Sequence, residues 1–183
     1  VVDDGSLGHG LEFDLADRLR QKARFYCAGQ LADGTWPHRV WASDGELAPG
    51  WANANVEHDD ASGEYQAHQT ARVTTFLATY LRTRKADFGE DLTTEIRRTL
   101  ADAVAAMTDS LDQNDLPELC QSIWEHEMGQ FTHAAARYLE AFAAVARAPV
   151  SEELADAART GADRIEAGLD GLWDEESGTY AKG

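Results

Sequence analysis

The stretch DLTTEIRRTLADAVAAMTDSL, residues 91–111, decides the fold class. Its apolar side chains recur every three or four positions, the spacing at which residues share one face of an α-helix. The members of this stripe are Leu92, Ile96, Leu100, Val104, Met107 and Leu111. Charged and small residues fill the remaining positions, so the stretch predicts one amphipathic helix over residues 90–111.

Four further stretches show the same helical spacing, and no stretch alternates polar and apolar residues as a strand would. The expected helices span residues 11–30, 65–84, 131–147 and 151–171. A chain of 183 residues with 43% hydrophobic content is large enough to bury one core. The sequence therefore predicts an all-α protein in which residues 1–183 form a single helical domain.

The connectors between the predicted helices alternate in length. Long connectors cover residues 31–64 and 112–130, and short ones cover 85–89 and 148–150. In an up-and-down array of helices, every second connector lies at the same end of the array. Both long loops are therefore expected on one face of the molecule, to which the tail beyond Leu172 returns.

The predicted helices also alternate in charge. ARVTTFLATY (71–80) and AAARYLEAFAAVA (134–146) are nearly uncharged, whereas SEELADAARTGADRIEAG (151–168) and the helix over 90–111 carry acids and arginines on one face. Uncharged helices suit an inner layer, and charged helices suit an outer layer. Helical repeats that each bury one face on a neighbour need several copies to close. The five helices are therefore expected to form part of a toroid of helical hairpins.

The formal net charge is −17, and the basic residues are all arginine except Lys22, Lys85 and Lys182. Such a surface repels nucleic acid and anionic lipid, so neither nucleic acid nor a membrane is expected as a partner. An acidic, lysine-poor surface is typical of a protein from a salt-saturated cytoplasm, because molar salt screens self-repulsion. We expect a halophilic, cytoplasmic protein, with an ordinary acidic protein as the alternative.

The two cysteines, Cys27 and Cys120, are far apart in the sequence and belong to no CxxC pair. We expect two reduced, buried thiols rather than a disulfide scaffold. No basic and apolar leader or membrane-length apolar stretch is present. The first residue, Val1, is compatible with a portion of a longer protein.

All five tryptophans lie outside the predicted helices or at the end of one: Trp36, Trp41, Trp51, Trp124 and Trp173. Long loops within a compact domain are usually functional. Indole rings beside carboxylates suit pyranose sugars, because the C–H face of the sugar stacks on the ring while its hydroxyls form hydrogen bonds. The alternative is that these indoles only anchor the long loops.

The densest group of functional side chains is SIWEHEMGQFTH, residues 122–133. A zinc site of the HExxH type needs a second histidine four residues after His126, where the chain has Gln130. A calcium loop starting at Asp112 needs a turn glycine and a bidentate carboxylate that this sequence lacks, so a turn is expected there. No metal or cofactor is expected.

What remains in this segment is Glu125, a carboxylate directly after Trp124 in a long loop. Hydrolysis of a glycosidic bond needs a protonated carboxylic acid that donates to the leaving oxygen. An apolar neighbour such as an indole raises the pKa of a carboxyl group by desolvating its anion. Glu125 is therefore the candidate general acid, and a solvated loop glutamate is the alternative.

These residues resemble the glucoamylase-like glycosidases of glycoside hydrolase family 15, particularly the archaeal and bacterial members. DLPELCQSIWEHEMGQFTHAAARYLEA (115–141) is similar to the family's Leu-Pro, Ser-x-Trp-Glu-Glu and Gly-x-aromatic-Thr segments. Three further stretches agree: DGTWPHRVW (33–41), YQAHQTA (65–71) and GLWDEESGTYAKG (171–183). Together these segments span nearly the whole chain in order.

The resemblance implies an (α/α)6 barrel that hydrolyses α-linked glucose from the non-reducing ends of glucans by inversion, with Glu125 as general acid and an α-glucan or oligosaccharide as substrate. It implies a sugar site formed by Trp36, Trp41, Gln66, His68, Trp124, His126 and Glu127. The family's catalytic base would lie beyond Gly183. The chain is therefore expected to be an interior portion, about half of a barrel.

Three positions depart from the family's pattern. His126 stands where the family has a second glutamate, His38 where it has glutamine, and His68 where it has aspartate. These imidazoles favour an alternative function, a non-catalytic carbohydrate-binding or regulatory helical toroid. A plain helical scaffold that binds no sugar is a third hypothesis.

Overall fold

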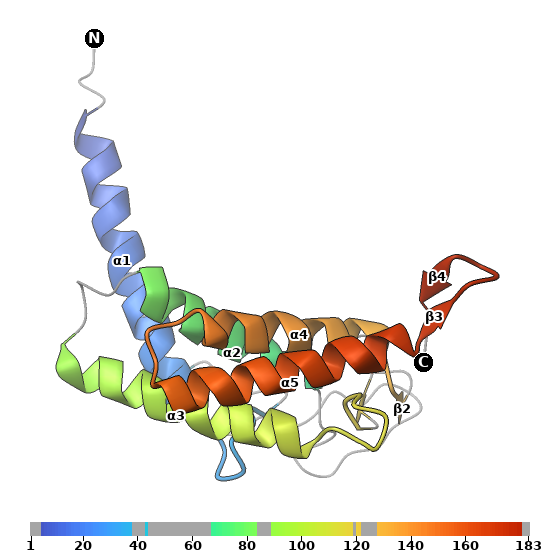
Figure 1. Cartoon of the computed structure of the whole chain (residues 1–183). Helices are drawn as coiled ribbons and strands as arrows, with labels where there is room; N and C mark the ends of the chain where they lie inside the picture. Colours follow the sequence, from blue (N-terminus) through green and yellow to red (C-terminus); the bar gives the residue numbers. More distant parts are fainter. Residues whose placement is uncertain are drawn as a thin grey trace.

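The structure is a computed structural model that describes residues 5–37, 43, 67–83, 89–118, 120–121 and 128–180. Within these residues there are five helices: α1 (Gly5–Ala28), α2 (Ala67–Thr83), α3 (Glu90–Asp109), α4 (Thr132–Ala146) and α5 (Glu152–Asp170) (Figure 1). The same residues contain four short strands: β1 (Cys120–Gln121), β2 (Met128–Gly129), β3 (Trp173–Asp174) and β4 (Thr179–Tyr180). The all-α class predicted from the sequence is confirmed.

The helices from α2 to α5 begin and end within two residues of their predicted positions. α1 differs, because it begins at Gly5 rather than at residue 11. The added stretch contains Gly8 and Gly10, although glycine is a poor helix former. Extending an existing helix costs far less than starting one, so these glycines can still be helical.

The expectation that the chain has no strands is wrong. β1 pairs with β2 and β3 pairs with β4, both in antiparallel orientation. A strand of two residues is too short to show the alternation of polar and apolar residues from which strands are predicted. In the turn between β3 and β4, Gly178 has a φ of 64°, a left-handed conformation that glycine adopts without steric cost.

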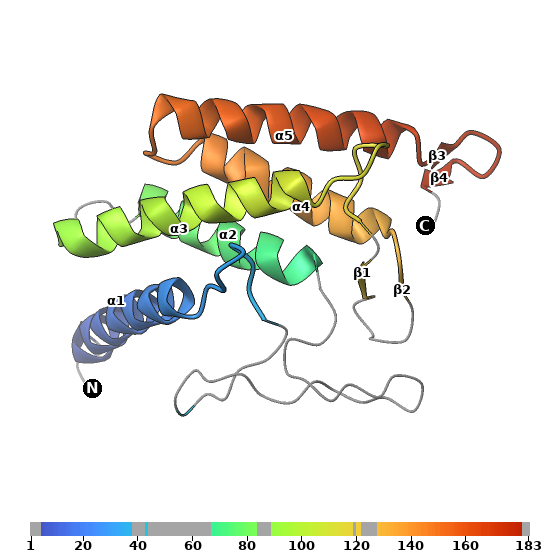
Figure 2. The ribbon, with the colours of Figure 1, turned by 90° about the horizontal axis from the view of Figure 1, so that it is seen from below.

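The helices form two layers. α2 and α4 pack against each other, α3 covers α2, and α5 covers α4 (Figures 1 and 2). α3 also contacts α5, while α1 contacts α3 and α2. We call α2 and α4 the inner helices and α3 and α5 the outer helices. This arrangement matches the predicted alternation of uncharged and charged helices.

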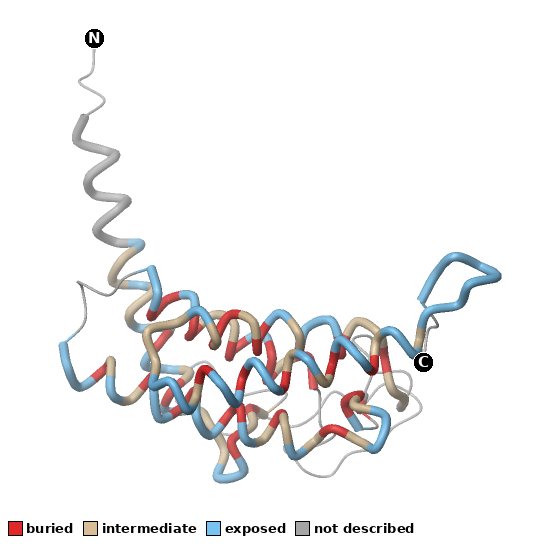
Figure 3. Tube along the Cα trace, viewed as in Figure 1, coloured by how far each residue is buried: buried red, intermediate tan, exposed pale blue. Residues whose placement is uncertain are grey.

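The hydrophobic core lies between these layers (Figure 3). All six residues of the stripe predicted from the sequence are buried: Leu92, Ile96, Leu100, Val104, Met107 and Leu111. On α4, the fully buried rings of Tyr138 and Phe142 meet edge to face with centroids 6.1 Å apart. A Cβ atom on Gly161 of α5 would lie 2.7 Å from the Phe142 ring. Glycine at this position therefore allows α5 to approach α4 closely.

The two layers run in opposite directions. The colours along the chain show that α2 and α4 begin at the end of the molecule where α3 and α5 finish (Figure 2). The four strands lie at this same end (Figures 1 and 2). The start of the first long loop is there too, because the backbone N–H of Trp36 donates to Thr70 Oγ1 at 3.3 Å. We call this the loop-bearing end, and it confirms the predicted common position of the long connectors for their described parts.

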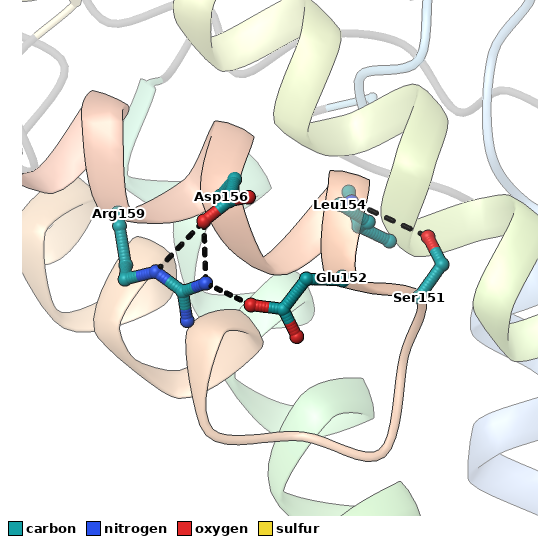
Figure 4. A network of polar contacts seen from close by, with 5 residues as sticks. All are labelled: Ser151, Glu152, Leu154, Asp156 and Arg159. Carbon is teal, nitrogen blue, oxygen red and sulfur yellow. Dashed lines mark hydrogen bonds and ion pairs between the residues drawn. The ribbon is translucent and has the colours of Figure 1, made fainter.

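Outer helix α5 shows how the charged face is organised. Ser151 caps the helix, since its Oγ accepts a hydrogen bond from the N–H of Leu154 at 3.3 Å (Figure 4). On the exposed face, Arg159 pairs with Glu152 at 2.6 Å and also with Asp156 (Figure 4). Solvent screens such exposed pairs, so they add little stability.

Cys27 and Cys120 are free and buried, as the sequence predicted. Desolvation raises the pKa of the Cys27 thiol to about 11, although the side chain of Thr99 acts in the opposite direction. Both thiols are therefore unreactive at neutral pH. Within the described residues, no helix combines the length and the apolar character needed to cross a membrane.

Candidate functional site

Both inner helices begin at the loop-bearing end, where the sequence predicts the sugar site. α2 starts at Ala67 and α4 starts at Thr132. The N-terminal end of a helix carries a partial positive charge and N–H groups that the helix itself leaves unpaired. Hydroxyl oxygens and anions are therefore favoured ligands at this end.

The strands β1 and β2 hold the two ends of the segment 122–127. Gln121 pairs with Met128, and Cys120 pairs with Gly129. The Cys120 side chain is fully buried and forms a hydrogen bond with the backbone of Ala67. Desolvation raises the pKa of this thiol, and the bond to Ala67 opposes the shift. Cys120 therefore attaches β1 to the start of inner helix α2.

The turn that precedes β1 is organised by Asp112. Its Oδ1 accepts hydrogen bonds from the N–H groups of Asn114 at 2.9 Å and Leu116 at 3.1 Å. Gln130 Nε2 donates to Asp112 Oδ2 at 2.9 Å and to the carbonyl of Pro117 at 3.1 Å. Desolvation opposes ionisation of Asp112, but these hydrogen bonds outweigh it and lower its pKa. The predicted turn is confirmed, and Gln130, the residue that follows β2, ties the turn to that strand.

The same turn rests on outer helix α5. Arg164 Nε donates to Asp115 Oδ1 at 2.6 Å, and both side chains are about one-third exposed. Asp115 itself has a φ of 60°, a left-handed conformation that aspartate tolerates. A Cβ atom on Gly168 would lie 2.7 Å from the Asp115 carbonyl oxygen. The backbone of the turn therefore lies directly on α5, which fixes the chain leading into β1.

His68 and His133 lie together near the first turns of the inner helices. Their ring centroids are 5.4 Å apart, with the ring planes tilted by 56°. The role of His68 at a sugar site stays a prediction, but its side chain is only 2% exposed. The physical reason is that the second residue of α2 points toward α4, and this direction is occupied by the core.

His133 contributes a buried polar atom to this pair. Its Nε2 atom is buried and has no hydrogen-bond partner among the described residues. Desolvation, followed by the charge of Arg137, lowers the pKa of His133 from the ordinary value of 6.5. The ring is therefore neutral at pH 7, and it is held between His68 and Phe131, whose centroid is 5.6 Å away.

Trp36, another residue predicted at the sugar site, is 7% exposed. Its indole N–H donates to the carbonyl of Tyr26 at 2.7 Å, which attaches the loop to the end of α1. This contact matches the alternative that indoles anchor the loops. Trp173 differs, because it is 42% exposed and meets Tyr180 edge to face at 5.0 Å across the β3–β4 pair.

Six residues predicted at the site lie outside the described residues: Trp41, Gln66, Trp124, Glu125, His126 and Glu127. Their roles stay predictions.

Sequence reasoning missed two described residues that support the site, Cys120 and Gln130. The sequence signal for Gln130 is the aspartate-rich turn with which its amide pairs. Cys120 gave no signal beyond its apolar surroundings.

The described residues hold no group of three or more His, Cys, Asp or Glu side chains that could bind a metal ion. Comparisons of the chain with protein-family models, with curated proteins and with solved structures gave no significant match.

Proposed function

We propose that this chain is part of a glucoamylase-like glycoside hydrolase, which releases glucose from the non-reducing ends of α-glucans or oligosaccharides with inversion. Glu125 is the general acid, and the catalytic base comes from outside these 183 residues. The two layers of helices form about half of an (α/α)6 barrel in this proposal. The observation that supports it most is the β1–β2 pair, which holds the ends of the Trp124–Glu125 segment at the loop-bearing end.

Covalent geometry limits where the general acid can be. Met128 is paired in β2, and Glu125 precedes it by three residues. Consecutive Cα atoms are about 3.8 Å apart, so the two Cα atoms are separated by at most about 11 Å. The β1–β2 pair therefore supports a position for Glu125 near the end at which the inner helices begin. A general acid needs such an anchored attachment, because misplacement by about 1 Å costs about 100-fold in rate.

The chemistry follows from the two side chains of this segment. Trp124 desolvates the neighbouring carboxyl group, which keeps Glu125 protonated until it donates to the leaving glycosidic oxygen. A second carboxylate, on the opposite face of the sugar, activates the attacking water. Inversion requires the two carboxyl groups to be about 6.5 to 9.5 Å apart. The 183-residue chain alone is therefore expected to be inactive.

The test is the variant Glu125→Gln in the longer polypeptide that carries both carboxylates. Glutamine preserves size but has no transferable proton, so glucose release should slow by about 100-fold to 10,000-fold. Affinity for maltooligosaccharide should change little. The control is Glu118→Gln, which changes an exposed glutamate before β1 and should leave the rate unaltered. Parental rates for Glu125→Gln, or hydrolysis by the 183-residue chain alone, would overturn the proposal.

The second candidate is a non-catalytic carbohydrate-binding or regulatory helical toroid. The buried His68–His133 pair favours it, because a position expected to contact sugar is part of the core. Titration of the longer polypeptide with maltooligosaccharide separates the two candidates. Binding without release of glucose selects the second candidate, and binding with release selects the first. No binding selects a plain helical scaffold.

A further inference from the structure

A second candidate site lies between three helices, and its lining includes none of the residues predicted for the sugar site. A groove with a volume of about 410 Å³ is formed by α1, α2 and α4. Its lining includes Leu19 of α1, Phe76 and Tyr80 of α2, and Arg137 and Glu140 of α4. Sites for small ligands typically have volumes of about 300 to 1,000 Å³ and mostly apolar walls. The groove has the size and the composition of such a site.

Aromatic rings form one wall of the groove. Phe76 and Tyr80, one turn apart on α2, are stacked with centroids 5.8 Å apart and planes within 8° of parallel. Tyr26 of α1 meets Phe76 edge to face at 5.4 Å, which fixes the position of that ring. Aromatic pairs of this kind are rigid and present a flat apolar surface. The wall therefore suits a ligand with a planar, apolar body.

The side chains around the groove carry a net positive charge, whereas the protein as a whole is strongly negative. Arg72 lies at its exposed rim, and no described residue pairs with this guanidinium. Arg137 is already paired with Glu140 at 2.6 Å. Lys22 adds a third cation, since its Nζ lies 4.9 Å from the centroid of the Phe76 ring. Three cations and one carboxylate thus meet here, on a chain whose net charge is −17.

We propose that this groove binds a small aromatic carboxylate. The ring of the ligand lies against Phe76 and Tyr80, and its carboxylate pairs with Arg72. A guanidinium matches a carboxylate with two parallel hydrogen bonds, which gives both affinity and orientation. A neutral ligand leaves Arg72 without a counter-charge. The site is independent of Glu125 and of the proposed hydrolysis.

The probe for this site is 4-phenylbutyrate, titrated into the 183-residue chain and followed by ligand-observed NMR and calorimetry. A ligand of this size should bind with a dissociation constant on the order of 0.1 to 1 mM. The neutral analogue 4-phenylbutan-1-ol has the same ring and chain length but no charge. It should bind about 10-fold more weakly, because it cannot form the charge-assisted pair. Absence of binding, or equal affinity for acid and alcohol, overturns the proposal.

Two variants locate the bound probe. Arg72→Ala should weaken 4-phenylbutyrate about 10-fold, because it removes the pairing cation. Arg82→Ala removes an exposed arginine of the same helix that does not line the groove, and it should leave the affinity unchanged. Thr79→Trp fills the groove from an exposed position and should abolish binding, while circular dichroism verifies that the helices are intact. The proposal fails if Arg72→Ala binds as Arg82→Ala does, or if the folded Thr79→Trp variant binds as the parent does.

Discussion

The inner and outer helices have similar lengths but very different compositions. Inner helices α2 and α4 each contain two charged residues, whereas outer helix α3 contains seven and α5 contains eight. An inner helix is covered on several sides by its neighbours. A charged side chain on it can therefore reach water only where no neighbour covers the helix. Arg72, Arg137 and Glu140 do so by lining the groove. An outer helix has one face in water, which accommodates charge at little cost.

The difference separates two sources of stability. Packing of large side chains against the inner helices supplies the folding free energy, because buried apolar area dominates folding. Charges on the outer helices determine how the protein responds to salt and contribute little at physiological ionic strength. Substitutions in the two layers should therefore differ in size and in salt dependence.

The largest effect is expected for Phe142→Ala on inner helix α4. The ring is fully buried and meets the Tyr138 ring edge to face. It also lies against Gly161, where α5 approaches α4 closely. Its removal should cost about 3 to 5 kcal/mol in the free energy of unfolding, measured with urea. The outer-layer comparison is Leu154→Ala on α5, a partly buried residue that should cost less than half as much. Equal losses for the two variants would contradict the distinction between layers.

The next effect tests how the turn before β1 lies on outer helix α5. Alanine at position 168 places a Cβ atom 2.7 Å from one backbone carbonyl oxygen and 2.8 Å from another. Gly168→Ala should cost about 1 to 3 kcal/mol, more than the gain of at most about 1 kcal/mol from better helix propensity. The control is Ala167→Gly, an exposed neighbour that tests propensity alone. A Gly168→Ala protein that is more stable than the parent would show that the turn can move away.

The helical part of the fold could be predicted because its signal is local. The stripe from Leu92 to Leu111 is set by residues three and four apart, and every member of it is buried. The charge of each helix likewise indicated its layer. The strands could not be predicted, because the pairing of Gln121 with Met128 depends on the path of the chain between them rather than on either residue.

The candidate site was predictable only in outline. The position of the loop-bearing end followed from connector lengths, which are visible in the sequence. The burial of His68 and Trp36 did not, because each depends on a partner distant in sequence, His133 and Thr70 respectively. The groove does have a signal in the sequence. Arg72, Phe76 and Tyr80 recur every four residues and mark the face of α2 that lines the groove.

A smaller effect concerns the pH dependence of stability. His133 has a lowered pKa in the folded protein, so its neutral form favours the folded state. Its contribution is complete above the unfolded pKa of about 6.5 and is lost as the pH falls toward the folded pKa, because the unfolded state binds more protons in that window. Arg137 and His68 are the titratable groups that face this ring.

The variant His133→Gln should therefore lose less stability between pH 7 and pH 5 than the parent does, when the free energy of unfolding is measured with urea. Between pH 7.5 and pH 8.5 the two proteins should show the same slope, which serves as the control. An unchanged slope between pH 7 and pH 5 would mean that the Nε2 environment is not desolvated as described.

The smallest effects distinguish the two layers by charge alone. The parent contains 33 acids and 16 bases, so its melting temperature should rise between dilute buffer and molar KCl as repulsion is screened. A melting temperature indifferent to KCl would contradict this expectation and with it the halophilic character. Two single substitutions then assign the salt response to a layer.

Glu166→Gln removes an exposed acid near the end of outer helix α5, whose last turn holds no basic residue. It should stabilise the protein in dilute buffer by a few tenths of a kcal/mol, because it relieves repulsion from neighbouring acids and from the helix dipole.

Glu140→Gln on inner helix α4 instead breaks the pair with Arg137, in which both side chains are 48% exposed. It should destabilise by about 0.2 to 1 kcal/mol. Thermal melts should show opposite signs in dilute buffer that converge toward zero in molar KCl, since salt screens both interactions. Shifts of the same sign would mean that local contacts, rather than the layer, decide how each acid contributes.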